Sequence, residues 1–145
     1  MDIKIIIKDF KFNIYGFSGT ATNKDYVGKA FQLTDKMWLV VKANGLKNKG
    51  MNIWVYEANE KLFAGVELNE APEDVTLLEQ KNIHLKKYAY YKHIGPYNLL
   101  KQAGQNMRNE SKYRGFEIIF PYIEIYGHWT EDESKLETEL LMCLR

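Results

Sequence analysis

Residues 116–128 read FEIIFPYIEIYGH, a stretch in which aliphatic and aromatic side chains alternate around one acid. Successive side chains of a β-strand point to opposite faces of the sheet. One face therefore carries the isoleucines Ile119, Ile123 and Ile125, and the other carries Phe120, Tyr122, Glu124, Tyr126 and His128. The alternation predicts a strand from Phe116 to Tyr126. We expect its isoleucines to pack on helices, which leaves an aromatic face with Glu124 at its centre.

Upstream, the first half of the chain predicts the order strand, helix, strand, strand. FNIYGFS (residues 12–18) is typical of a strand. Thr22-Asn23 can cap a helix expected from Lys24 to Lys42, where apolar residues recur at helical spacing. After a loop at residues 44–50, two strands are expected at Asn52–Glu57 and Leu62–Leu68, joined by a hairpin turn.

The second half repeats that order. Residues 69–79 predict a linker, and IHLKKYAYYKHI (residues 83–94) predicts one strand. Gly95-Pro96 ends that strand and opens a helix expected from Tyr97 to Asn109. The strand around Glu124 follows, and ETELLMCL (residues 137–144) predicts the last strand.

Two such units predict an α+β fold, a pseudo-twofold pair of strand–helix–strand–strand units. Its antiparallel sheet would carry both helices on one face and a central ligand cleft. We expect a single domain over residues 1–145, with one half at about 1–69 and the other at about 80–145. If Tyr56 corresponds to Tyr126, then Trp54 corresponds to Glu124, and both lie near the axis between the halves. A carboxylate opposite an indole, with tyrosines around it, suits an aromatic or cationic ligand.

Composition limits the function classes. The chain is 46% hydrophobic and 27% charged with a net charge of +1, which argues against a broad nucleic-acid-binding surface. No stretch approaches the roughly 18 apolar residues of a membrane span, and the N-terminus lacks a signal-peptide core. Cys143 is the only cysteine, so no internal disulfide can form and a cytoplasmic location is expected. The three histidines show no metal-ligand spacing, so we expect no metal and no cofactor.

Three segments resemble a known family. YAYYKHIGPY (residues 88–97), PYIEIYGHW (residues 121–129) and ETELLMCL (residues 137–144) resemble the GyrI-like small-molecule-binding domain. This is also the effector-binding domain of AraC-type and MerR-type bacterial regulators. The likeness extends over nearly the whole chain, although Cys143 stands where the family often has proline. Since the first strand is expected near Ile3, with no room for a DNA-reading domain ahead of it, the resemblance predicts a stand-alone member.

The resemblance implies a central cleft for bulky cationic or aromatic compounds, with the key acid in the strand that carries Glu124. Three roles remain open for a stand-alone member. The first is multidrug binding or sequestration. The second is hydrolysis of strained cyclopropane-type genotoxins, and the third is interaction with gyrase or a regulator protein.

The expected ligand-binding residues are Glu124, Trp54, Tyr56, Tyr122, Tyr126, Phe120, Tyr91 and Glu67. In a hydrolase, Glu124 would activate water and Tyr126, or alternatively Tyr91, would polarise the leaving group. Glu67 can be a second cleft acid or a structural carboxylate. Trp129 can be a lid of the cleft or a surface residue, and His93 is expected to bind backbone at the turn that follows it.

Overall fold

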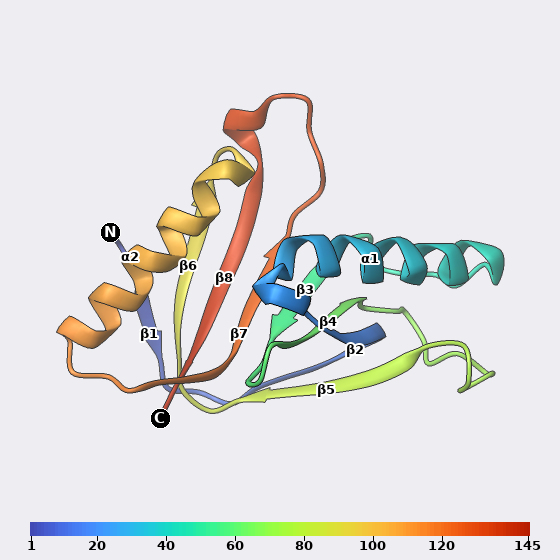
Figure 1. Cartoon of the computed structure of the whole chain (residues 1–145), viewed down its shortest axis with the longest axis horizontal. Helices are drawn as coiled ribbons and strands as arrows, with labels where there is room; N and C mark the ends of the chain where they lie inside the picture. Colours follow the sequence, from blue (N-terminus) through green and yellow to red (C-terminus); the bar gives the residue numbers. More distant parts are fainter.

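The computed structural model describes all residues, 1–145, and contains one eight-stranded antiparallel sheet with two helices (Figure 1). The strand order is β1-β6-β8-β7-β3-β4-β2-β5. The strands are β1 (Lys4–Ile6), β2 (Phe10–Thr20), β3 (Ile53–Tyr56), β4 (Lys61–Val66), β5 (Glu79–Leu85), β6 (Tyr88–Ile94), β7 (Ile118–Tyr126) and β8 (Glu137–Leu144). The helices are α1 (Tyr26–Ala43) and α2 (Leu100–Tyr113), with 3-10 turns at Thr22–Lys24, Tyr97–Leu99 and Glu133–Lys135.

The sheet is symmetric about the boundary between β7 and β3. Moving outward, β7, β8, β6 and β1 on one side correspond to β3, β4, β2 and β5 on the other. At the boundary, Trp54 is the cross-strand partner of Glu124, and Tyr56 is the partner of Tyr122. The predicted correspondence of Trp54 with Glu124 across a pseudo-twofold axis is confirmed.

Each half of the sheet is completed by an edge strand from the other half of the sequence. β1 lies at the N-terminus but pairs with β6, and β5 lies beyond residue 69 but pairs with β2. The halves expected at about 1–69 and 80–145 thus exchange their outer strands.

The segment at residues 83–94 is not the single strand that the sequence predicts. It contains the end of β5 and the whole of β6, separated at Lys86-Lys87. The break lets Ile83 and Leu85 pair with β2 while Tyr88 starts the ladder with β8. Apolar residues continue on both sides of the lysines, so hydropathy alone does not mark the break.

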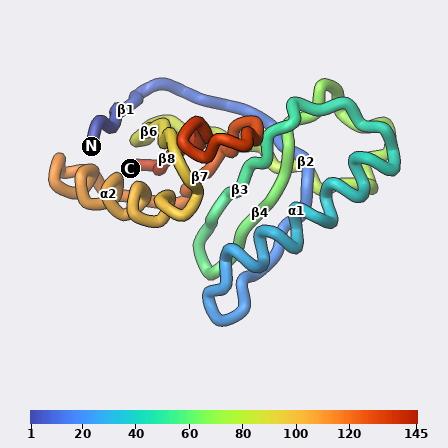
Figure 2. Tube along the Cα trace, turned by 90° about the horizontal axis from the view of Figure 1, so that it is seen from above, coloured from blue at the N-terminus to red at the C-terminus, as the bar shows by residue number.

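Each helix covers its own half of the sheet on the same side. Asp25 caps α1 by accepting a hydrogen bond from the backbone N–H of Gly28 at 3.0 Å, rather than the expected Thr22-Asn23. α1 packs on Leu62 and Ala64 of β4 through Ala30 and Leu33. α2 packs on β6 and β8 through Leu100, Ala103 and Met107. Seen from above, α1 and α2 flank the central strands (Figure 2).

The isoleucines of β7 do not pack on the helices, so that expectation is wrong. Ile123 is fully buried in a cluster of 10 residues, and Ile119 and Ile125 pack against it. Every member of this cluster lies on a strand. The sheet curls so that its two halves meet on the face away from the helices, where the rings of Phe10 (β2) and Tyr88 (β6) lie 6.0 Å apart. Curvature therefore closes the isoleucine face, and the aromatic face of β7 is the one beneath the helices.

No helix is both long and apolar enough to span a membrane.

Candidate functional site

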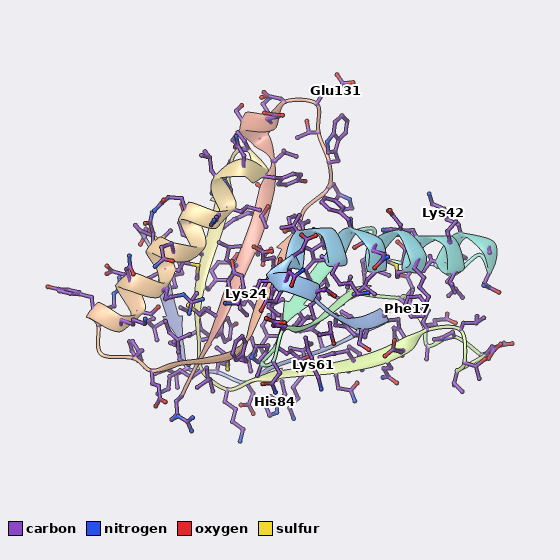
Figure 3. All side chains as sticks on the ribbon, in the orientation of Figure 1. Phe17, Lys24, Lys42, Lys61, His84 and Glu131 are labelled. Atoms are coloured by element: carbon purple, nitrogen blue, oxygen red, sulfur yellow. The ribbon has the colours of Figure 1, made fainter.

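A cavity of about 860 Å³ opens between the two helices above β3 and β7. The N-terminal part of α1 contributes Tyr26, Val27 and Phe31. The other wall comes from the 3-10 turn and α2, with Tyr97, Asn98, Leu100, Lys101, Gly104, Gln105 and Arg108. Its floor contains Asn52, Trp54, Tyr56, Tyr122, Glu124 and Tyr126. Lys24 stands at the end of α1 that faces α2, and Glu131 at the tip of the β7–β8 loop that rises beside the cleft (Figure 3).

Glu124 lies on the floor of this cleft and is only 7% exposed. Its Oε1 accepts hydrogen bonds from the hydroxyls of Tyr56 and Tyr126, both at 2.9 Å. Its Oε2 accepts one from the hydroxyl of Tyr122 at 3.2 Å. Three phenols therefore solvate one carboxylate in place of water.

The strand geometry explains this arrangement. Tyr122 and Tyr126 stand two residues on either side of Glu124, so all three side chains leave β7 on the same face. Tyr56 joins them because β3 runs antiparallel to β7 with Trp54 opposite Glu124. The alternation of side chains along β7 and the register between β3 and β7 therefore bring the carboxylate and the three phenols together.

Burial governs the electrostatics of Glu124. Desolvation raises the pKa of its carboxyl, and the hydrogen bonds from the tyrosines offset part of that rise. Burial first, and the charge of Glu124 second, raise the pKa values of Tyr56, Tyr122 and Tyr126. The phenols therefore remain protonated donors over the ordinary pH range. Glu124 takes part in none of the six ion pairs of the molecule, so its charge has no cationic partner within the protein.

Rings that line the cleft contact one another edge to face, and Tyr126, a partner of Glu124, is one of them. The ring of Trp54 lies 4.9 Å from that of Tyr126 and 5.2 Å from that of Phe31. The ring of Tyr97 lies 5.5 Å from that of Tyr126. The indole N–H of Trp54 donates to Thr34 Oγ1 at 2.9 Å, which fixes the orientation of the buried ring. Phe31 is 56% exposed and offers its ring to the cleft.

The structure brings together six of the eight predicted site residues. They are Trp54, Tyr56, Phe120, Tyr122, Glu124 and Tyr126, all of which line the cleft. Tyr91 does not line it, and packs instead against the cluster formed by α2, β6 and β8. Glu67 follows the last residue of β4 and also lies outside the cleft; its carbonyl oxygen accepts the backbone N–H of Lys49 at 2.9 Å.

The structure also gives the positions of Trp129 and His93. Trp129 is 71% exposed and lines both the cleft and a smaller adjoining cavity of about 280 Å³. His93 Nε2 donates to the carbonyl oxygen of Pro96 at 3.2 Å. The prediction that His93 binds backbone at the turn is confirmed.

Sequence reasoning missed the helical walls of the cleft. Val27 and Phe31 are apolar residues one turn apart on α1, beside the buried stripe that contains Ala30 and Leu33. When the apolar stripe of a helix is wider than the face that packs on the sheet, the additional apolar residues can indicate the wall of a cleft. Lys101 and Arg108 give no such signal, because cations on an amphipathic helix are typical of a solvated face.

No group of three or more His, Cys, Asp or Glu side chains in the structure is placed to hold a metal ion.

No family model and no curated protein matches the sequence. Solved structures do match it. The crystal structure of the EcmrR C-terminal domain superposes with a TM-score of 0.76 at 17% identity, over 100% of this chain and 99% of that one. SAV2435 bound to tetraphenylphosphonium gives a TM-score of 0.67 at 17% identity, over 100% of this chain and 94% of that one. A hydrolase from Listeria innocua gives 0.60 at 10% identity, over 99% and 91%. At these identities the likeness is one of fold.

Proposed function

We propose that this chain, which has the GyrI-like fold, binds small aromatic or lipophilic cationic compounds in the cleft between its helices. One observation carries the proposal: Glu124 is a buried carboxylate on the floor of a cavity of about 860 Å³, and it has no cationic partner in the protein. A buried charge that is solvated only by neutral groups gains from a counter-ion of the right size. The role fits a binding or sequestering protein for several compounds of this class.

The ligand would be held by charge and by rings. Its cationic centre would lie against Glu124, with Tyr56, Tyr122 and Tyr126 holding the carboxylate in place. Its apolar groups would contact Phe31 and the edges of Trp54 and Tyr126. Each ring that faces a cation adds about 0.5–2 kcal/mol, while burial of apolar ligand surface adds about 25 cal/mol per Å².

The likeness to SAV2435 supports this ligand class. That protein has been solved with tetraphenylphosphonium, a cation shielded by four phenyl rings. The present chain has the same fold and offers an acid among rings in a cleft of suitable size.

Titration of the chain with tetraphenylphosphonium, followed by tryptophan fluorescence and calorimetry, tests the proposal. We expect saturable binding. Fluorescence should report it, because Trp54 and Trp129 both line the cleft. Glu124→Gln keeps the shape of the side chain but removes its charge, and should weaken binding about tenfold or more, because a desolvated charge pair is lost. Glu67→Gln is the matched control outside the cleft and should bind as the wild type does. Equal affinity of Glu124→Gln and the wild type would refute the proposal.

Hydrolysis is a second candidate, favoured by the raised pKa of the Glu124 carboxyl and by the Listeria innocua hydrolase of the same fold. Glu124 would take a proton from a water whose oxygen bonds to a strained ring carbon, while the ring C–C bond breaks and its electron pair moves onto the conjugated carbonyl. Tyr126 would donate a proton to that carbonyl oxygen and regain one from Glu124, to which it is hydrogen-bonded. The same titration decides between the two, when repeated with an excess of an electrophilic cyclopropane. A binding protein takes up one equivalent of the compound and leaves it unchanged. A hydrolase converts the whole excess into a product heavier by one water molecule, and Glu124→Gln should abolish this turnover.

A further inference from the structure

Four charged side chains line the cleft: Glu57, Lys101, Arg108 and Glu124. Glu57 is neutralised by an ion pair with Lys81 of β5. Neither Lys101 nor Arg108 takes part in any ion pair or side-chain hydrogen bond of the molecule. The cleft therefore contains three charged side chains without an ion pair: the anion Glu124 and the cations Lys101 and Arg108.

Both cations belong to the same wall. Lys101 and Arg108 are two turns apart on α2, so they project from one side of that helix. Arg108 lies close enough to Tyr122 for its charge to lower the pKa of that phenol, against the larger effect of burial. Between the two cations, a Cβ on Gly104 would lie 3.3 Å from the hydroxyl oxygen of Tyr122. The α2 wall thus stands directly over one of the three phenols that hold Glu124.

The opposite wall is uncharged. α1 presents Tyr26, Val27 and Phe31 to the cleft and no charged side chain. The cleft is therefore divided into an apolar side on α1, an anionic floor at Glu124 and a cationic side on α2. A ligand with only a positive charge would be attracted by the floor and repelled by the α2 wall.

We propose that the preferred ligands are amphoteric: flat aromatic compounds with a cationic centre for Glu124 and an acidic group for Lys101 and Arg108. The proposal rests on the binding function proposed above and narrows its ligand class. An acid on the ligand would satisfy both free cations while its ring system lies on the α1 side.

A rhodamine with a free benzoate and the methyl ester of the same rhodamine provide matched probes. Both carry the same aromatic cation, and only the free acid adds a carboxylate. We expect the wild type to bind the free acid about fivefold more tightly than the ester, given the modest strength of partly exposed charge pairs. Lys101→Gln with Arg108→Gln should reduce this ratio to about one and should tighten ester binding, because the repulsion between the α2 wall and the cationic dye is removed. High salt should reduce the ratio as well.

The controls separate this inference from the binding function. Lys42→Gln with Lys112→Gln removes the same net charge from exposed helical positions outside the cleft and should preserve the ratio. Glu124→Gln should weaken both dyes alike. A ratio of one in the wild type, or a ratio unchanged by the double substitution at Lys101 and Arg108, overturns the inference alone. Failure of both dyes to bind the wild type overturns the binding function together with it.

Discussion

At the scale of single residues, the burial of the Glu124 carboxylate has a cost in stability. Its carboxylate loses water on folding and receives three phenol hydrogen bonds in return. These bonds do not fully compensate for burial, since the pKa of the carboxyl remains raised. A side chain kept at such a cost is typical of a ligand-binding position.

The sign of that pKa change predicts how stability depends on pH. The folded chain holds the Glu124 proton more tightly than the unfolded chain does, because its pKa lies above the ordinary value of 4.5. The contribution of Glu124 to stability therefore falls as pH rises from about 4.5 to the raised pKa. Glu124→Gln should remove this dependence and raise the free energy of unfolding at neutral pH by about 0.5–2 kcal/mol.

Urea unfolding of the wild type and Glu124→Gln across this pH range measures the difference between them. Glu67→Gln serves as the control and should follow the wild type at every pH. A wild type that is more stable than Glu124→Gln at neutral pH would show that the phenols outweigh the cost of burial.

At the scale of single elements, the sequence predicts β7 and β8 well and misplaces what covers them. ETELLMCL gives the bounds of β8, and the alternation around Glu124 gives the two faces of β7. Alternation alone cannot tell which face a helix covers. Ile123 was expected beneath a helix, but the curl of the sheet buries it among other strands. That curl depends on contacts such as Phe10 with Tyr88, which are distant in sequence.

The α2 wall could not be predicted for a different reason. Lys101 and Arg108 occur on a helix whose polar face is indistinguishable in sequence from a face in contact with solvent. Only the position of α1 opposite α2 places these two cations on the wall of a cleft. Tyr91 and Glu67 were wrongly assigned to the cleft because their residue types suit one. Tyr91 on β6 and Glu67 after β4 both lie outside it.

The pairing of β2 with β4 depends on two glycines. Gly16 is the cross-strand partner of Gly65, and a Cβ on Gly16 would lie 1.9 Å from the carbonyl oxygen of Ala64. Gly16→Ala must therefore displace backbone, and we expect it to lower the free energy of unfolding by about 3 kcal/mol or more. Asn13→Ala, at an exposed position of the same strand, should change it by less than about 0.5 kcal/mol. Urea denaturation compares the two, and similar values would mean that β2 and β4 can separate at little cost.

At the scale of the whole molecule, the exchange of edge strands ties the halves together. β1 carries the N-terminus to the far edge of the sheet, and the chain then returns to start β2 in the other half. Ile3, just before β1, is 3% exposed and packs with Leu100 and Met107 of α2. The two halves should therefore unfold as one unit.

Ile3→Ala tests this coupling. The lost side chain should lower the free energy of unfolding by about 2–4 kcal/mol. Trp38 and Trp54 lie in the other half, on α1 and β3, and report on its unfolding by fluorescence, whereas Trp129 is already 71% exposed in the folded chain. We expect the fluorescence transition and the circular dichroism transition to move together to lower temperature. A fluorescence transition that stays at the wild-type temperature, while circular dichroism shows a separate earlier step, would mean that the halves unfold independently.

The pair formed by Trp54 and Glu124 has a consequence for how such a molecule can be built. Two identical subunits joined about a twofold axis would place the same side chain on both sides of it. Two glutamates there would repel at close range, and two tryptophans would supply no charge. A carboxylate facing an indole across the axis is closed to two identical subunits, but it is open to a single polypeptide whose two repeats differ in sequence.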